Sequence, residues 1–172
     1  MSVQFSPRTL FEATEIDWQI TAVAWRGSCL ELFSRAEASL DQCLEELARL
    51  GFDLGPAASH PGATARFRAL SEFVAADTEM VHGPACVRML ENWSDLLAQR
   101  VLVAHGKMNV SDEGVRLSYR EHLGKKGHKD HKDSFTRIEM LSLLKKLSED
   151  QLQLHQQLGQ IRAEARLKAA RH

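Results

Sequence analysis

The chain contains few of the residues that shape strands and tight turns. Among its 172 residues it has four prolines and a single tyrosine, and runs that alternate apolar with polar residues are scarce. Apolar residues instead recur at three- and four-residue steps, which is the spacing of amphipathic helices. The composition therefore favours an all-α protein over a sheet-based fold.

Cysteine is also sparse. Cys29, Cys43 and Cys86 form an odd set with no pairing pattern. Cys29 and Cys43 lie on one predicted helix, about 20 Å apart at a rise near 1.5 Å per residue, which is too far for a disulfide within one chain. The set argues against a disulfide-stapled secreted fold. It indicates reduced, partly buried thiols of a cytosolic protein.

The sequence has neither a long apolar run nor a strong net charge. No run approaches the length that spans a membrane, and residues 1–9 lack the charged and apolar regions of a signal peptide. We therefore expect a cytoplasmic protein with no membrane partner. Lys and Arg number 22 against 23 Asp and Glu, for a formal net charge of -1. Attraction to nucleic acid must then come from local patches.

Apolar spacing predicts four helices, at about residues 12–50, 63–76, 84–104 and 134–166. Amphipathic helices of these lengths favour a single domain over residues 1–172, built as an antiparallel four-helix-type bundle. Residues 106–133 are polar and are expected to form a loop or a short β-hairpin before the last helix. Residues 162–172 carry four Lys and Arg side chains against Glu164 and are expected to be a helix end that frays.

The same spacing predicts which side chains form the core. The inward positions are Val23, Leu30, Phe33, Leu40, Leu44 and Leu47, then Phe67, Leu70, Phe73 and Val74, and finally Phe135, Ile138, Leu141, Leu144, Leu147, Leu154, Leu158 and Ile161. Trp18, Trp25 and Trp93 have the ring faces that stack on bases. Because all three lie on predicted helices, packing in the core or in a subunit interface is the favoured interpretation.

The most compact set of reactive groups lies between Trp93 and Gly106, where a helix is expected to end at the glycine. Arginine binds phosphate oxygens through a planar fork of donors, and histidine exchanges a proton near neutral pH. For RNA cleavage, His105 suits removal of the 2′-hydroxyl proton, and Arg100 suits charge stabilisation at phosphorus. On an ideal helix the two lie about 140° apart. They meet only if the helix end is distorted or if two copies face each other.

The pattern Arg-x4-His-Gly, after an apolar helix with Trp93, resembles the signature of HEPN domains, which are named for higher eukaryotes and prokaryotes nucleotide binding. A long first helix, a short second helix, the motif helix and a long last helix agree with that family in outline. The resemblance implies a homodimeric, metal-independent endoribonuclease with Arg100 and His105 as catalytic residues and no cofactor. Lys107 is a candidate contact for the RNA substrate. The resemblance also implies a toxin or phage-defence role, with an antitoxin as a further partner.

Two alternative functions stay open. The same fold is also used as a non-catalytic dimerisation or partner-binding module, which Val101 favours, because many family members carry Asn, Asp or His directly after the arginine. The second alternative is that the chain binds a small nucleotide.

Residues 120–133 hold three histidines and two aspartates, but their spacing matches no zinc motif, so no metal is expected. A solvated loop whose lysines touch an RNA backbone is favoured there.

Overall fold

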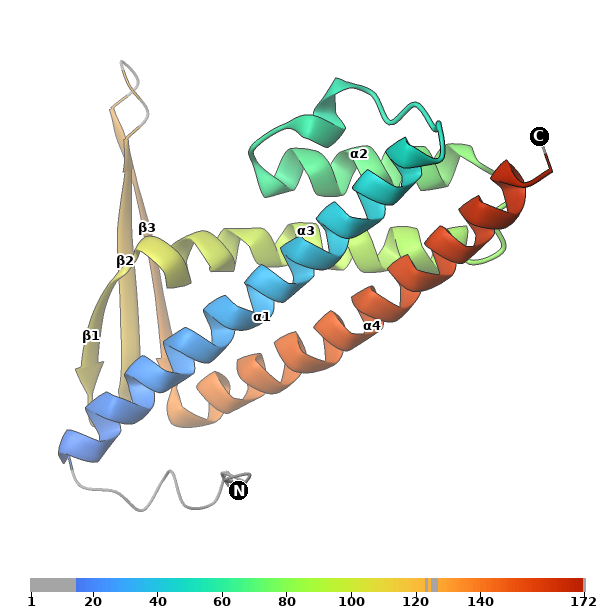
Figure 1. Cartoon of the computed structure of the whole chain (residues 1–172). Coiled ribbons are helices and arrows are strands. Elements are labelled where there is room, and N and C mark those ends of the chain that lie inside the picture. Colours follow the sequence, from blue (N-terminus) through green and yellow to red (C-terminus); the bar gives the residue numbers. More distant parts are fainter. Residues whose placement is uncertain (1–14, 123, 125–126, 172) are drawn as a thin grey trace. The chain divides into compact units, whose positions relative to one another are not determined.

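The computed structural model describes residues 15–122, 124 and 127–171, and it is mostly helical with one small sheet (Figure 1). In chain order the elements are α1 (Glu15–Arg49), the 3-10 helix η2 (Pro56–Ser59), α2 (Ala63–Ala76), α3 (Gly83–His105), β1 (Lys107–Ser111), β2 (Gly114–His122), β3 (His128–Thr136) and α4 (Arg137–Ala169). Within the described residues, no helix combines the length and apolar character that crossing a membrane requires.

The four predicted helices are all present. The second occupies the predicted residues, Ala63–Ala76, and the third differs by one residue at each end. The predicted start of the first helix at residue 12 lies outside the described residues. The last helix is displaced by three residues, because β3 holds the chain extended until Thr136. Apolar spacing thus predicts where the helices lie. The exact start of α4 depends on the preceding strand, which local spacing does not reveal.

The polar segment 106–133 is not a loop, and it holds more than a hairpin. Three antiparallel strands occupy it in the order β1-β2-β3 and continue to Thr136. Val115 pairs with Val110 on one side and with Phe135 on the other. The prediction of an all-α fold is therefore corrected to a mostly helical fold with a three-stranded sheet. The alternation in β2 and β3 is hard to recognise because the packed face is apolar only at Val115, Leu117 and Phe135. The rest of that face carries Tyr119, Glu121, Lys129, His131 and Asp133.

Register and side-chain alternation divide the sheet into two faces. The packed face consists of Met108, Val110, Val115, Leu117, Tyr119, Glu121, Lys129, His131, Asp133 and Phe135. The open face consists of Lys107, Asn109, Ser111, Arg116, Ser118, Arg120, His122, His128, Asp130, Lys132, Ser134 and Thr136. Val115, Leu117 and Phe135 of the packed face are buried, whereas every residue of the open face but the half-buried Ser118 is exposed.

The chain divides into two compact units. The sheet unit comprises Met1–Leu30 and Val101–Leu144, and the helical unit comprises Glu31–Arg100 and Lys145–His172. Helices α1, α3 and α4 each contribute a segment to both units.

The core of the sheet unit is built around two tryptophans of α1. The ring of Trp25 lies 5.4 Å from that of Phe135, and its Nε1 donates to the Met140 carbonyl at 2.9 Å. Trp18 donates from Nε1 to the Ser111 carbonyl at 2.8 Å. The guanidinium of Arg137 lies 4.3 Å from the centre of the Trp18 ring. Both indoles are buried with their N–H groups satisfied, so the prediction that they pack rather than bind bases is confirmed.

Trp93 is the centre of the helical unit and is fully buried. Its ring meets the edge of Phe33 at 5.7 Å and stacks on Phe67 at 6.5 Å, and its Nε1 donates to the Asp150 carbonyl at 3.3 Å. Helices α1, α2, α3 and α4 therefore all contribute atoms around this one side chain. The three cysteines are free and buried, and burial raises the pKa of each thiol to about 12.

The helices of the helical unit are not all antiparallel. Ser39 contacts His155 at 3.2 Å, and further along the same two helices Glu46 pairs with Arg162 at 3.8 Å. Both partners advance together, so α1 and α4 run parallel, and the predicted antiparallel arrangement is wrong for this pair. The change of direction arises before α3, because Glu37 pairs with Arg66 at 3.6 Å and Phe52 meets Phe73 further along, so α1 and α2 also run parallel.

Three predicted core residues are exposed. Val23 is 60% exposed, Ile138 is 77% exposed and Leu141 is 39% exposed. Val23 lies on the opposite side of α1 from the buried stripe that contains Trp18 and Trp25. Ile138 and Leu141 lie in the first turns of α4, on a side away from the buried Met140. Apolar spacing placed them inward, but the buried stripe of α1 contains Trp18 and Trp25, and that of α4 contains Met140, Leu143 and Leu147.

The C-terminal segment, which was expected to fray from residue 162, is helical to Ala169. Arg166 pairs with Glu46, and Lys168 Nζ donates to Asp77 Oδ2 at 2.8 Å. The hydrogen bond from Lys168 holds the pKa of Asp77 below its ordinary value. These long-range pairs hold the last turns in place.

The Asp77–Lys168 pair should make stability depend on pH. The folded-state pKa of Asp77 is lowered, so the pair stabilises the fold above the unfolded-state value near 4 and is lost as pH falls through the lowered value. Lys168→Met should cost about 0.5–1 kcal/mol at neutral pH. In thermal melts, its deficit against the wild type should shrink as pH falls below about 4. Lys145→Met, at an exposed i,i+4 pair, is the control, and a deficit independent of pH would contradict the assignment.

Candidate functional site

Arg100 lies near the end of α3, in the helical unit, and is engaged in an ion pair. Its Nε donates to Glu37 Oε1 at 2.8 Å, and the other oxygen of Glu37 lies 3.6 Å from Arg66. The side chain of Arg100 is 35% exposed. One edge of the guanidinium is therefore committed to holding α3 against α1, which is a structural role that the sequence analysis did not foresee.

His105 is the last residue of α3 and belongs to the sheet unit, where its side chain is exposed. A single residue, Gly106, separates α3 from β1. The amide of Gly106 donates to the Leu102 carbonyl at 2.8 Å, and a Cβ on Gly106 would press into that same carbonyl oxygen. The glycine of the motif is thus required by the sharp passage from helix to strand, which fixes where His105 lies.

His105 is the first member of a row of functional side chains. Its ring lies 5.9 Å from that of Tyr119, and Tyr119 lies 6.1 Å from the ring of His131. The Nε2 of His131 lies 2.9 Å from Glu121 Oε2, within hydrogen-bond distance. We call these four residues the imidazole row. It brings together two histidines, a phenol and a carboxylate from three elements of one unit.

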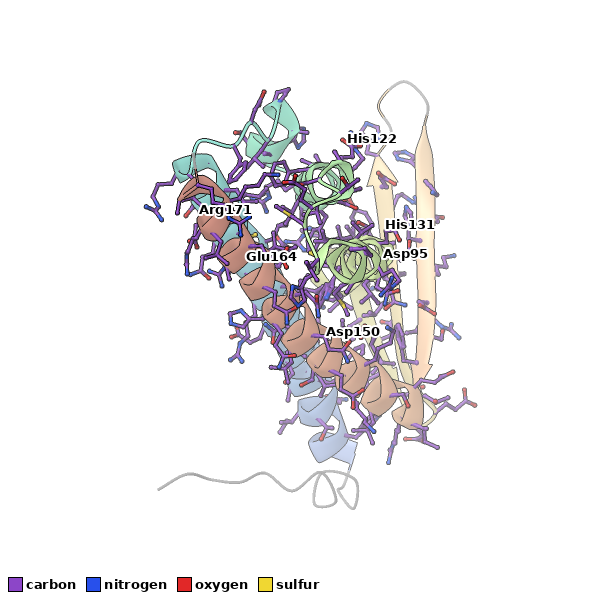
Figure 2. All side chains as sticks on the ribbon, turned by 90° about the vertical axis from the view of Figure 1, so that its right-hand side faces the viewer. Asp95, His122, His131, Asp150, Glu164 and Arg171 are labelled. Carbon is purple, nitrogen blue, oxygen red and sulfur yellow. The ribbon has the colours of Figure 1, made fainter. Side chains whose placement is uncertain are left out.

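The sheet positions three members of the row. Tyr119 and Glu121 are alternate residues of β2, and His131 is the cross-strand partner of Tyr119 on β3. All three are therefore on the packed face, beyond its buried apolar end, and are only half-buried. His131 and His122 are labelled in Figure 2, with His122 nearer the end of the β2–β3 hairpin. Half-burial leaves the row accessible to a ligand while the strands restrict its motion.

The row offers acid–base chemistry. Histidine is able to take or give a proton near neutral pH, and the carboxylate of Glu121 orients the ring of His131 and compensates positive charge on it. The ring of Tyr119 neighbours both imidazoles, and a phenol hydroxyl is a hydrogen-bond donor. A displacement at phosphorus uses one group that takes a proton and one that gives a proton.

The predicted pair Arg100 and His105 is not brought together by an interaction in the described residues. The two lie five residues apart on α3 and in different units, so their joint action stays a prediction. Lys107 begins β1 and is exposed on the open face, because it pairs with Ser118. Its role as a substrate contact also stays a prediction.

Sequence reasoning missed Tyr119, Glu121 and His131 as site residues. It placed the histidine in a solvated loop and left the tyrosine unassigned. The signal was the alternation Val115, Leu117, Tyr119 on β2, whose cross-strand partners on β3 are Phe135, Asp133 and His131. A strand pairing of these two runs would have set the only tyrosine opposite a histidine.

The other histidines of the segment form a separate pair. His122 and His128 are cross-strand partners on the open face, with ring centroids 4.9 Å apart and their Nδ1 atoms 3.2 Å apart. Within the described part of the chain, no group of three or more His, Cys, Asp or Glu side chains is arranged to hold a metal ion.

Comparison with protein-family models, curated proteins and solved structures gave no match to this chain.

Proposed function

We propose that the protein cleaves RNA by metal-independent acid–base catalysis at the imidazole row. The observation that carries the proposal is that the rings of His105 and His131 both neighbour the ring of Tyr119, at 5.9 and 6.1 Å, and that Glu121 lies 2.9 Å from His131. The histidine of the Arg-x4-His-Gly motif is thereby joined to a second histidine that the motif does not contain.

The proposed reaction uses the two histidines in complementary states. Neutral His105 takes the proton of a ribose 2′-hydroxyl, and the 2′-oxygen forms a bond to the adjacent phosphorus. The bond from phosphorus to the 5′-oxygen breaks, and protonated His131 gives its proton to that leaving oxygen. The products are a 2′,3′-cyclic phosphate and a 5′-hydroxyl end, and exchange with water restores both histidines.

Glu121 and Tyr119 support these proton transfers. Glu121 favours His131 for the protonated role, since its carboxylate compensates the positive charge of that imidazole. Tyr119 neighbours both rings, and its hydroxyl is suited to donate to a non-bridging phosphate oxygen as charge develops there. His105 is the more exposed histidine and makes no such ion pair among the described residues, which suits the neutral role.

The HEPN resemblance supports the same reaction class and adds partners. It implies a homodimer, with Arg100 acting on the phosphate, and a toxin or defence role with an antitoxin. These remain predictions that rest on the motif.

A second candidate is a non-catalytic module that binds a partner. It is favoured by the pairing of Arg100 with Glu37 and by the structural need for Gly106. Both observations give the motif residues a reason to be present without catalysis. The two functions differ in whether the wild-type chain breaks phosphodiester bonds at all.

Incubation of the wild-type protein with a single-stranded RNA in EDTA tests the proposal. We expect cleavage that persists in the chelator and leaves 2′,3′-cyclic phosphate ends, because the proposed steps use no metal ion. An all-2′-deoxy strand of the same sequence should stay intact, since it lacks the nucleophile. Activity that disappears in EDTA and returns with magnesium would refute the mechanism. Intact RNA under all conditions would favour the binding module.

A further inference from the structure

The open face of the sheet is unusually basic for a chain with almost no net charge. It carries Lys107, Arg116, Arg120 and Lys132 against one acidic residue, Asp130. Asp130 is held by Arg120 through two contacts, at 2.7 and 3.3 Å. The other three cations have no ion pair among the described residues. The open face therefore keeps an uncompensated positive charge.

These three cations surround one position of the sheet. Lys107 on β1 and Lys132 on β3 are the two cross-strand partners of Ser118 on β2. Arg116 is the next open-face residue along β2, about 7 Å away at the usual strand rise. The cations are thus spread in two dimensions around a hydroxyl, at separations similar to those between successive phosphates of an extended strand.

A hollow of about 390 Å³ adjoins this cluster. Arg116 lines it together with the polar side chains of Asn109 and Ser134 and with the carboxylate of Glu113. Amide and hydroxyl groups beside a guanidinium form hydrogen bonds to phosphate and to ribose. The hollow therefore extends the cationic cluster with neutral donors and acceptors.

We infer that the open face binds the sugar–phosphate backbone of single-stranded RNA, centred on Lys107, Arg116 and Lys132. The choice of RNA rests on the proposed function, and the choice of surface rests on the sheet. Uncompensated cations interleaved with hydroxyl and amide groups complement a phosphate–ribose chain. The face has no Trp, Tyr, Phe or large aliphatic residue, so it lacks both the stacking platforms that hold bases and the apolar groups that enter a lipid surface. Contact is with the backbone and is independent of sequence.

The start of β1 connects this surface with the imidazole row. Lys107 belongs to the open face, and His105 lies only two residues earlier, beside Tyr119 of the packed face. Two residues span at most about 7 Å. An RNA strand that passes around this end of β1 is therefore able to contact Lys107 while its next phosphate lies at His105. This path gives Lys107 the substrate contact predicted from the sequence.

Fluorescence anisotropy with a labelled single-stranded 2′-O-methyl RNA measures binding without cleavage, because the probe lacks the nucleophile. The triple variant Lys107→Gln, Arg116→Gln, Lys132→Gln should weaken binding at least about tenfold near 0.1 M salt. It should also reduce the slope of log affinity against log salt by about 2, since each phosphate contact to a single strand contributes about 0.7. All three side chains are exposed, and thermal melts check that the variant folds.

A matched control removes three exposed cations elsewhere. Arg35→Gln, Arg68→Gln and Lys145→Gln, each in an i,i+4 pair of the helical unit, should change affinity less than about twofold. Equal losses in both triple variants, unchanged binding in the first, or absence of wild-type binding would overturn the inference. Equally tight binding of a poly-glutamate peptide would also overturn it in favour of an acidic protein. A wild type that binds the probe on this face but leaves RNA intact would refute the proposed function alone.

Discussion

Replacing His105 or His131 by alanine should each lower the rate of RNA cleavage about 100- to 10,000-fold, the usual contribution of a general acid or base. Each histidine carries one of the two proton transfers, and neither is able to replace the other. Both rings contact Tyr119 at the surface of the sheet unit, His105 exposed and His131 half-buried. The fold should therefore change by less than about 1 kcal/mol. The measurement is the initial rate on a labelled RNA, with a thermal melt of each variant.

Two further variants test whether a loss of cleavage rate is specific to the residues of the imidazole row. His155→Ala removes an exposed histidine of α4 in the helical unit, outside both the row and the open face, and it should keep the wild-type rate. Glu121→Gln keeps the shape of a positioning residue but removes its charge, and it should lower the rate less than His131→Ala does. Undiminished cleavage by His131→Ala would remove this residue from the mechanism. If only Arg100→Ala and His105→Ala lose activity, the active site consists of the two motif residues and does not include His131.

Gly106→Ala should destabilise the fold by about 2–3 kcal/mol, the range expected when an added methyl group is forced into fixed neighbours. The added Cβ would meet the carbonyl oxygen of Leu102, to which the amide of Gly106 itself donates. Because this backbone belongs to the last turn of α3, it is unable to retreat without displacing His105. Chemical denaturation gives the free energy of unfolding, and cleavage measured below the transition should fall as well.

Gly27→Ala is the control, and its effect should have the opposite sign. Gly27 lies inside α1, and nothing is within 4 Å of a Cβ built on it. Alanine in a helix interior is about 0.5–1 kcal/mol more favourable than glycine. If Gly27→Ala stabilises the fold and Gly106→Ala destabilises it, the contact of the added Cβ, and not helix propensity, determines the change in stability. A neutral Gly106→Ala would mean that the helix-to-strand passage is looser than described.

Helices were predictable from this sequence because their signal is local. The apolar stripes of α2 and α3 recur at helical spacing, and the fully buried Trp93 and Phe67 were placed on them correctly. The prediction of which side chains are buried was wrong where it rested on spacing alone. Ile138 continues the three-residue pattern of α4, but the helix begins only one residue earlier and turns that side chain outward.

The sheet and the candidate site were less predictable because they depend on distant pairings. His131 follows Tyr119 by twelve residues, and only the register between β2 and β3 sets them opposite each other. The ion pair of Arg100 with Glu37 joins residues 63 positions apart. Local composition drew attention to His105, but strand register determines which residues lie beside it.

The buried thiols provide each unit with an internal probe of its own opening. A thiol with a pKa of about 12 is almost entirely protonated near neutral pH, and a buried one is also shielded from reagents. Cys29 belongs to the sheet unit, whereas Cys43 and Cys86 belong to the helical unit. Alkylation of each cysteine under native conditions therefore reports how often its own surroundings open. The rates at Cys29 and at the other two, followed by mass spectrometry, distinguish separate opening of the units from unfolding of the whole chain.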